Sequence, residues 1–241
     1  MGLELGKYGL APLTFEEQAE VVARIQYWFP FWCAAPVFYV DNPLVTRADV
    51  FHGPRLAAGI RLWLDMVARH KVRVVLIDTV NKSEGRRLLK DTDEDARGFL
   101  TRGEILKLTA YARDRGVKVL WAGGITLSQA YTFGKLGVFG VYVTSAAATL
   151  QPLGRKARRD PFLVGLREPD QHKVARVKLA LEAGFLIGRG AAELAPDVEA
   201  LLAAVAAGES AKADVLQARL HPRFVRAWRD HLANPVTGRP S

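Results

Sequence analysis

The sequence predicts a mixed α/β fold of the TIM-like (β/α)-barrel type, and three observations point to it. Apolar segments alternate with segments of helical periodicity along residues 3–148. The predicted strands are apolar along their length, which is typical of parallel strands buried on both faces. A doubly wound sheet and a barrel both fit this order. The glycines of "WAGGIT", followed one unit later by "VYVTSAAA", favour the barrel, because the last two loops of many barrels bind phosphate.

Local signals predict the individual elements. Strands are expected at residues 3–8, 31–40, 72–80, 117–124 and 138–148. Capping boxes, in which a Thr and a Glu or Gln three residues later cap each other, should begin three helices: Thr14 with Glu17, Thr101 with Glu104 and Thr126 with Gln129. Pro54 stands at the first position of a further helix, which the apolar spacing continues to about residue 70. Gly116 should end the helix that follows Thr101.

The rest of the chain predicts an extension of this core. We expect a β/α-barrel core over residues 1–150 and an extension, α/β at first and then helical, over residues 151–241. Residues 161–194 have the pattern strand, helix, short strand. From Pro196 to His231 the pattern indicates helices broken at Gly208 and Pro222.

Composition limits the possible classes of protein. The 241 residues contain one cysteine, Cys33, so we expect no disulfide framework, no multi-cysteine zinc site and a reducing, cytoplasmic location. No apolar run approaches the roughly 18 residues of a membrane span, and the polar start does not fit a secretory signal. The histidines are not spaced as metal ligands, and no P-loop or dinucleotide motif is present. We therefore expect no metal, no cofactor and no membrane partner.

The net charge of +9 leaves three interpretations open. Basic residues concentrate at 154–160 and again at 221–231. They can form a solvated surface, attract a phosphorylated ligand or bind nucleic acid. Nucleic acid is the least supported of the three, because no zinc-finger, RNP or KH motif accompanies the charges.

The stretch "VRVVLIDTVNKSEG" (72–85) carries the main candidates for catalysis. Asp78 ends the predicted strand, Thr79 follows it, and Lys82 stands on the next loop. In a β/α barrel the carboxyl ends of the strands surround the active site. An amine can form an imine with a carbonyl substrate, and a nearby carboxylate can move protons. The alternative is a surface salt bridge in which Asp78 caps the loop.

A phosphate site is predicted at the next two strand ends. Gly123 and Gly124 would let backbone N–H groups approach a phosphate, with the positive end of the following helix pointing toward it. Thr144 and Ser145 would contribute from the loop after the last strand. The alternative is that the two glycines only form a tight strand-to-helix turn.

Two segments, "LIDTVNKSEGRRLLKD" and "KVLWAGGITLSQAYTFGKLGVFGVYVTSAAA", together resemble the (5-formylfuran-3-yl)methyl phosphate synthases of methanofuran biosynthesis. In that family a strand ends in Leu-Asp-Thr and is followed, after two residues, by Lys-Asp-Gly. Asp78, Thr79 and Lys82 match this motif. "VFYVD" is similar to the family's Tyr-Ala-Asp strand end, which adds Asp41 as a candidate catalytic residue. The resemblance covers roughly residues 3 to 148.

The resemblance implies a metal-free β/α-barrel lyase that joins two molecules of glyceraldehyde 3-phosphate into a furan phosphate. Its lysines would form the imine and transfer protons. The family's first β/α units have no counterpart here, and Glu4 stands where the family has a lysine. Lys7 is close by, but its odd spacing from Glu4 places it on the opposite face of a strand.

Three functions therefore remain open. The first is an active lyase or synthase that acts on a phosphorylated triose. The second is a catalytically reduced homologue that serves as the partner subunit of a biosynthetic complex. The third is a nucleic-acid-binding protein that uses the basic C-terminal region. An open five-stranded sheet would expose its edges, so we also expect a homo-oligomer with "YWFPFW" (27–32) in its contact.

Overall fold

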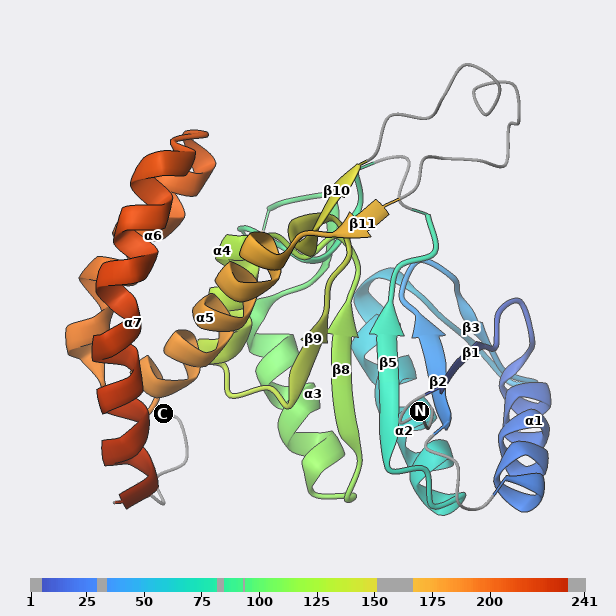
Figure 1. Ribbon diagram of the computed structural model, residues 1–241. Coiled ribbons are helices and arrows are strands. Elements are labelled where there is room, and N and C mark those ends of the chain that lie inside the picture. Colours follow the sequence, from blue (N-terminus) through green and yellow to red (C-terminus); the bar gives the residue numbers. More distant parts are fainter. Residues whose placement is uncertain (1–5, 30–33, 82–84, 93, 151–166, 234–241) are drawn as a thin grey trace. The chain divides into compact units, whose positions relative to one another are not determined.

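The computed structural model describes residues 6–29, 34–81, 85–92, 94–150 and 167–233 of the chain (Figure 1). It forms two compact units. The first unit comprises Met1–Gly124 and Val138–Tyr142, and the second comprises Ile125–Gly137 and Val143–Ser241. The second unit therefore holds part of the predicted core together with the predicted extension.

The first unit is built on a parallel sheet, so the predicted mixed α/β class is confirmed. Its strands are β1 (Gly6–Gly9), β2 (Ala34–Tyr39), β5 (Val74–Asp78), β8 (Lys118–Ala122) and β9 (Gly140–Tyr142). Consecutive strands are neighbours, in the order β1-β2-β5-β8-β9. The last strand is shorter than the predicted stretch 138–148. Thr144 leaves the extended conformation, with φ −120° and ψ −67°, and the 3-10 turn η2 (Ser145–Ala147) follows.

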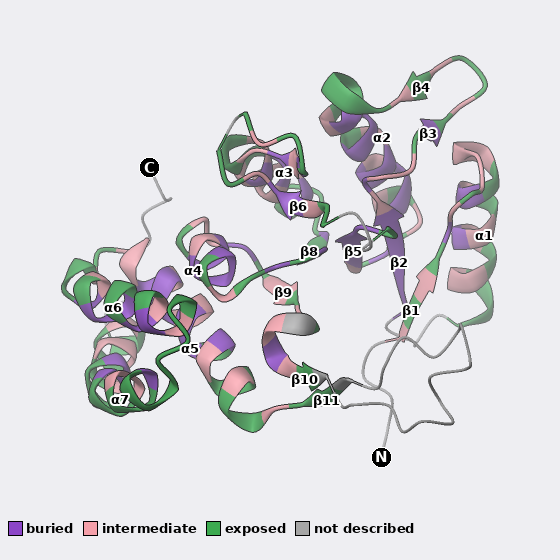
Figure 2. Ribbon diagram, turned by 90° about the horizontal axis from the view of Figure 1, so that it is seen from above, coloured by how far each residue is buried: buried purple, intermediate pink, exposed green. Residues whose placement is uncertain are grey.

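Three helices cover one face of this sheet. They are α1 (Phe15–Trp28), α2 (Leu56–Arg69) and α3 (Arg102–Arg113). Each belongs to the connection between two strands that are neighbours in the sheet. Right-handed connections between parallel neighbours place such helices on the same side, as Figure 2 shows. The predicted capping boxes are present at the starts of α1 and α3. Pro54 lies in the 3-10 turn η1 (Gly53–Arg55) directly before α2.

A buried glutamine, Gln18, is hydrogen-bonded within the core between the sheet and the helices. Trp63 on α2 is fully buried, and its ring meets that of Phe38 edge-on with the centroids 5.4 Å apart. The buried amide of Gln18 donates to the carbonyl of Leu13 at 2.8 Å and accepts from the Trp63 indole N–H at 3.0 Å. Because both ends of the amide are paired, Gln18 joins α1 to α2 without the cost of an unsatisfied buried group.

We call the opposite face of the sheet the concave face. Its central residues pack together: Val37, Leu76 and Ala122, with Tyr39 and Leu120 beside them. Side chains on one face of a flat sheet stand parallel to each other, and its first and fifth strands would lie about 19 Å apart. The amine of Lys7 on β1 nevertheless lies 4.5 Å from the ring centroid of Tyr142 on β9. The sheet is therefore strongly curved, as the arc of strands in Figure 2 shows.

Two pairs of short strands join the first unit without a counterpart among the sequence predictions. β3 (Leu44–Val45) and β4 (Val50–Phe51) are antiparallel, and β6 (Arg87–Leu89) and β7 (Gly98–Leu100) are parallel. Strands of two or three residues are too short to show an alternating pattern. The backbone N–H of Leu88 donates to the carbonyl of Gly123 at 2.9 Å, so β6 lies against the end of β8.

The second unit is mainly helical. Its elements are α4 (Leu127–Lys135), the antiparallel pair β10 (Ala148–Leu150) and β11 (Arg167–Pro169), α5 (Gln171–Ile187), η4 (Ala192–Leu194), α6 (Ala195–Ala206) and α7 (Ser210–Ala233). The predicted capping box of Thr126 and Gln129 begins α4. Two glycines bring α4 and α5 together. A Cβ atom at Gly134 would lie 2.0 Å from the carbonyl oxygen of Leu181, and one at Gly184 would lie 2.3 Å from that of Tyr131.

Two predictions for this region are wrong. The short strand predicted at the end of residues 161–194 is absent, because α5 continues to Ile187 and η4 follows. Pro222 does not break a helix, since α7 runs through it. An interior proline costs a helix about 3 kcal/mol, and tertiary contacts on both sides of Pro222 favour the helix. Leu220 and Phe224 are buried in the core of this unit. Arg219 and Arg223 both donate to the buried carboxylate of Asp197 in the first turn of α6.

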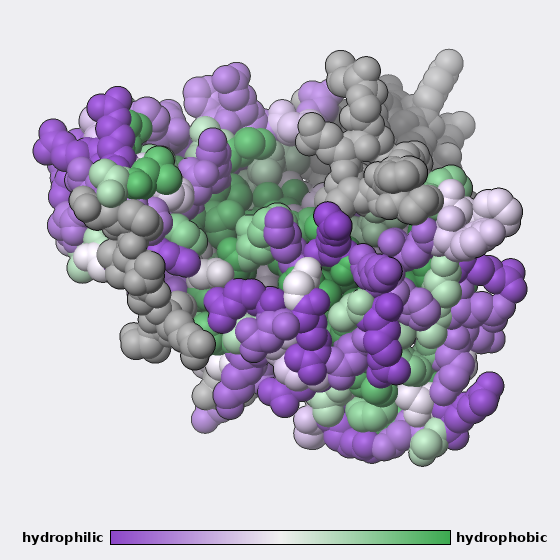
Figure 3. All heavy atoms as spheres, turned by 90° about the horizontal axis from the view of Figure 1, so that it is seen from below, coloured by the Kyte–Doolittle hydropathy of each residue, from purple (hydrophilic) through white to green (hydrophobic). Residues whose placement is uncertain are grey.

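The surface of the described part carries both hydrophilic and hydrophobic side chains. On the face seen in Figure 3, hydrophilic side chains predominate and hydrophobic ones show between them. Three consecutive aromatic residues at the end of α1 are exposed, namely Tyr27, Trp28 and Phe29. No helix in the described ranges combines the length and the apolar character that crossing a membrane requires.

Candidate active site

Asp78 lies at the carboxyl end of the central strand β5 and is buried. One of its carboxylate oxygens accepts a hydrogen bond from the backbone N–H of Thr79 at 2.8 Å. In the sheet it lies opposite Tyr39 of β2, and one residue beyond the pair of Ile77 and Trp121. Asp78 shares the face of Leu76, two residues earlier, so it belongs to the concave face. A buried carboxylate at this edge of the sheet is a candidate general base.

Tyr39 is the polar neighbour of Asp78 on the concave face. Burial raises the pKa of its phenol, and the nearby carboxylates of Asp78 and Asp41 raise that pKa further. Its ring packs on Gly9 of β1, where an added Cβ would lie 3.1 Å from the phenol oxygen. Tyr39 therefore keeps its proton at neutral pH and can donate a hydrogen bond to a ligand.

Asp41 anchors the loop that leads from β5 to Lys82. One carboxylate oxygen accepts from the backbone N–H of Val80 at 2.9 Å, and the other from that of Asn81 at 2.7 Å. The resemblance suggested Asp41 as a catalytic residue, and this contact gives it a positioning role. Lys82 itself lies outside the described residues, so its distance from Asp78 is not described.

Thr79 and the two glycines form a tight packing arrangement after β5 and β8. Thr79 is buried, and its hydroxyl has no hydrogen-bond partner among the described residues. A Cβ at Gly123 would lie 2.9 Å from that hydroxyl oxygen, and Gly123 has φ +108°. Gly124 is exposed, has φ +65°, and lies against Arg87. Packing and backbone conformation thus give each glycine a structural reason, and the phosphate interpretation stays a prediction.

The other two predicted phosphate ligands belong to the second unit. Thr144 is exposed and directly precedes η2, and its carbonyl accepts from the N–H of Ala147 at 3.2 Å. Ser145 is the first residue of that turn. Gly123 and Gly124 lie in the first unit, so the arrangement of the two loops relative to each other is not described.

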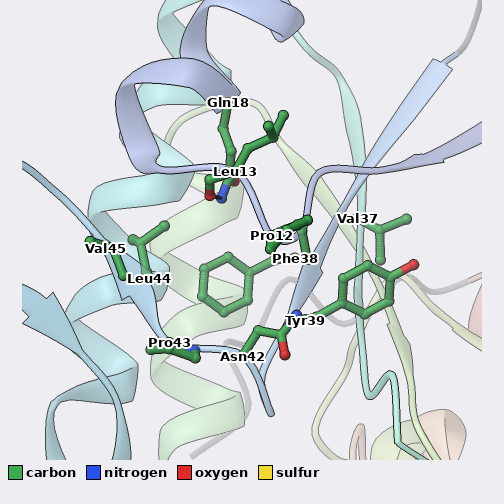
Figure 4. A pocket seen from close by; sticks show the side chains of 11 residues that line it. Pro12, Leu13, Gln18, Val37, Phe38, Tyr39, Asn42, Pro43, Leu44 and Val45 are labelled. Atoms are coloured by element: carbon green, nitrogen blue, oxygen red, sulfur yellow. Dashed lines mark hydrogen bonds between the residues drawn. The ribbon is translucent and has the colours of Figure 1, made fainter.

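A small pocket opens beside Tyr39 where β1 and β2 end (Figure 4). It has a volume of about 170 Å³ and lies between the loop after β1 and the loop after β2. The lining side chains are mostly apolar: Ala11, Pro12, Leu13, Gln18, Val37, Phe38, Tyr39, Asn42, Pro43, Leu44 and Val45. A cavity of similar size accepts a benzene-sized group. The signal for it was present in the sequence, since both loops directly follow predicted strands at the end of the sheet where β/α proteins bind ligands.

Lys7 lies on the concave face, which the sequence pattern did not indicate. The spacing of three residues from Glu4 predicts only that the two side chains point to opposite faces, and Glu4 lies outside the described residues. In the structure Lys7 pairs with Ala35, two residues before the pair of Gly9 and Val37. Lys7 therefore shares the concave face with Val37, and its amine contacts Tyr142 there.

The described residues contain no group of three or more His, Cys, Asp or Glu side chains that could hold a metal ion. No protein-family model matches the chain, and no match was found among the curated proteins. The fold and the site thus define a parallel β/α protein with a buried acid at a strand end.

Proposed function

We propose that this chain is a lyase or synthase that joins phosphorylated triose carbonyls, in the manner of the (5-formylfuran-3-yl)methyl phosphate synthases that it resembles. The observation that carries the proposal is the burial of Asp78 at the carboxyl end of the central strand, on the concave face. Asp41 adds to it, because it anchors the loop that leads to Lys82. Such an arrangement suits imine formation at a lysine with a carboxylate as the proton carrier.

The geometry of the sheet supports an eight-stranded barrel as the fold behind this chemistry. In a barrel with eight strands and a shear of eight, residues at equal height shift by about one residue per strand. The sheet ladder leads from Lys7 through Ala35, Val74 and Lys118 toward Val138, just before β9. Tyr142, the residue that Lys7 contacts, lies four residues beyond Val138. A shift of one residue per strand, taken over the four steps from β1 to β9, predicts this offset of four residues.

The same shift arranges the concave face in layers. Lys7, Leu76 and Tyr142 come from alternate strands and fall at one height, as side chains do in a barrel interior. Gly9 and Asp78 fall in the next layer toward the carboxyl ends, about 7 Å higher, since residues on one face repeat every second position. The proposed reaction centre therefore has an acid, Asp78 of β5, in its upper layer and a lysine, Lys7 of β1, in the layer below.

The proposal is tested by trapping the imine. The full-length chain is incubated with glyceraldehyde 3-phosphate and borohydride, and intact mass and peptide mapping locate any adduct. We expect one adduct, on Lys82, which Lys82→Ala abolishes and Asp78→Asn reduces by orders of magnitude. Lys118→Ala is the control and should leave the adduct unchanged. Lys118 lies on the same face but at the amino end of β8, away from Asp78. A wild-type chain that traps nothing and forms no product would overturn the proposal.

The partner-subunit function has one observation in its favour. Within the described sheet, β1 and β9 each pair with a strand on one side only. In a closed barrel both edges would be paired. If further strands come from another polypeptide, the isolated chain should bind triose phosphate weakly and turn over only in the complex. Full turnover by the purified chain alone would exclude this function.

A further inference from the structure

Building on the proposed function, we propose that Lys7 is the phosphate-binding cation of the concave face. The ligand would be a phosphorylated triose or another three-carbon phosphate. The inference depends on the position of the Lys7 amine, on its neighbours and on the space around it.

The position of the amine comes from two independent facts. The strand register places Lys7 on the same face as Val37 and Leu76. Its contact with Tyr142, at 4.5 Å from the ring centroid, shows that the side chain reaches across the concave face and does not turn outward. Lys7 therefore lies on the face that would line the barrel interior, and the strand register places it one layer below Asp78.

The neighbours of the amine leave its charge free for a ligand. Within the described residues no carboxylate forms an ion pair with Lys7, and its amine lies over the ring of Tyr142. Both side chains are exposed. A contact between an exposed ammonium and an aromatic ring is weak, so a phosphate can replace it, and the phosphate would form a charge-assisted hydrogen bond with the amine.

Glycine brings a ligand-binding hydroxyl close to β1. Gly9 is the next residue after Lys7 on the same face of β1, and it has no side chain. The ring of Tyr39 packs against it, with the phenol oxygen 3.1 Å from where a Cβ would stand. A ligand whose phosphate lies at Lys7 would extend its carbon chain toward Tyr39 on the neighbouring strand β2 and toward the layer of Asp78, about 7 Å higher.

Lys118 provides a matched control. It lies on the same face of the sheet, and its amine also contacts an aromatic ring, that of Phe139, at 4.9 Å. It stands at the start of β8, at the end of the sheet away from Asp78. The two lysines therefore share charge and type of contact and differ in their distance from the proposed site.

The experiment uses glycerol 3-phosphate, which has the phosphate but no carbonyl and cannot form an imine. Calorimetry on the full-length chain should show that Lys7→Met weakens binding by at least about tenfold. Lys7→Arg, which keeps the charge, should stay within about threefold of the wild type, and Lys118→Met within about twofold. Circular dichroism checks that each variant is folded. No binding by the wild type, no loss in Lys7→Met, or an equal loss in Lys118→Met would overturn the inference.

Borohydride trapping keeps the two proposals apart. An adduct on Lys82, together with glycerol 3-phosphate binding that is insensitive to Lys7, would overturn the Lys7 site and leave the lyase standing. Binding that depends on Lys7 without any adduct would support the phosphate site and remove the imine chemistry.

Discussion

The carboxylate of Asp41 holds the backbone N–H of Asn81 at 2.7 Å, and through it the loop that continues to Lys82. The two residues are 40 positions apart in the chain, and the sheet brings them together because β2 and β5 are neighbours. Asp41, which the resemblance suggested as a catalytic residue, thus binds the backbone of the loop that leads to Lys82, the proposed nucleophile.

We expect Asp41→Asn to separate catalysis from stability. The amide keeps the shape of the side chain but loses the charge that strengthens both hydrogen bonds, so unfolding free energy should fall by about 1 kcal/mol. Trapping of glyceraldehyde 3-phosphate on Lys82 should fall by more, at least about tenfold, because the loop is less well held. Asp114→Asn, at an exposed carboxylate after α3, is the control. Reduced stability with unchanged trapping would show that Asp41 does not position Lys82.

The predicted phosphate loop can be tested with two glycines of equal backbone strain. Gly124 has φ +65° and Gly116, at the end of α3, has φ +70°. Alanine at either position should cost about 1 kcal/mol, because a side chain is disfavoured in this conformation. Only Gly124→Ala should weaken triose phosphate binding in calorimetry, since its Cβ would stand where a phosphate approaches the backbone of the loop after β8. Equal affinities for the two variants would exclude the phosphate interpretation and leave only the tight turn.

The contribution of Asp65 to the free energy of unfolding should change with pH. Burial acts to raise the pKa of Asp65, but hydrogen bonds from Arg115 and Tyr111 outweigh it, and the pKa is lowered. A lowered folded-state pKa stabilises the fold above the unfolded value of about 4, and this contribution disappears as pH falls through the folded-state pKa. Asp65→Asn should therefore lose about 1 kcal/mol at neutral pH, and urea unfolding curves should converge with those of the wild type at acid pH. A constant difference at all pH values would contradict this.

The close approach of α4 and α5 predicts a large effect of one methyl group. A Cβ at Gly184 would lie 2.3 Å from the carbonyl oxygen of Tyr131, which is backbone and cannot move aside alone. Gly184→Ala should therefore lower the unfolding free energy by about 1–3 kcal/mol. Gly103→Ala is the matched control, because its Cβ would meet nothing within 4 Å in the first turn of α3. It should be neutral or stabilising by up to about 1 kcal/mol, and similar losses in both would refute the packing argument.

The aromatic end of α1 predicts self-association. Tyr27 is 77% exposed, Trp28 is 71% exposed and Phe29 is 50% exposed, whereas large apolar side chains usually avoid water when they are adjacent. We expect a dimer or larger oligomer in sedimentation velocity at micromolar concentration, which Trp28→Lys dissociates. Leu232→Lys, at a residue of α7 that is 72% exposed, should have no effect. A wild-type chain that sediments at 26.5 kDa would contradict the prediction. Residues 30–32 of the predicted contact lie outside the described residues.

Local signals were enough for much of the first unit. The capping boxes at Thr14, Thr101 and Thr126 all form, because their hydrogen bonds join residues three positions apart and need no tertiary partner. The parallel sheet was also predictable, since strands buried on both faces need continuous apolar segments. The position of Asp78 at a strand end follows from the same pattern.

The features that only the tertiary structure reveals all depend on contacts between distant segments. Pro222 lies within a helix whose neighbouring turns pack Leu220 and Phe224 into the core and bind Asp197 of α6, and no local rule contains these contacts. Likewise, alternation along β1 tells which residues share a face, but not which face lies inside. Pairing with β2 and the curvature of the sheet decide this, and they turn Lys7 toward Tyr142. The sequence pattern thus defines the elements and their strand-end residues, whereas register and curvature define which side chains meet, because those arise only when the strands pair.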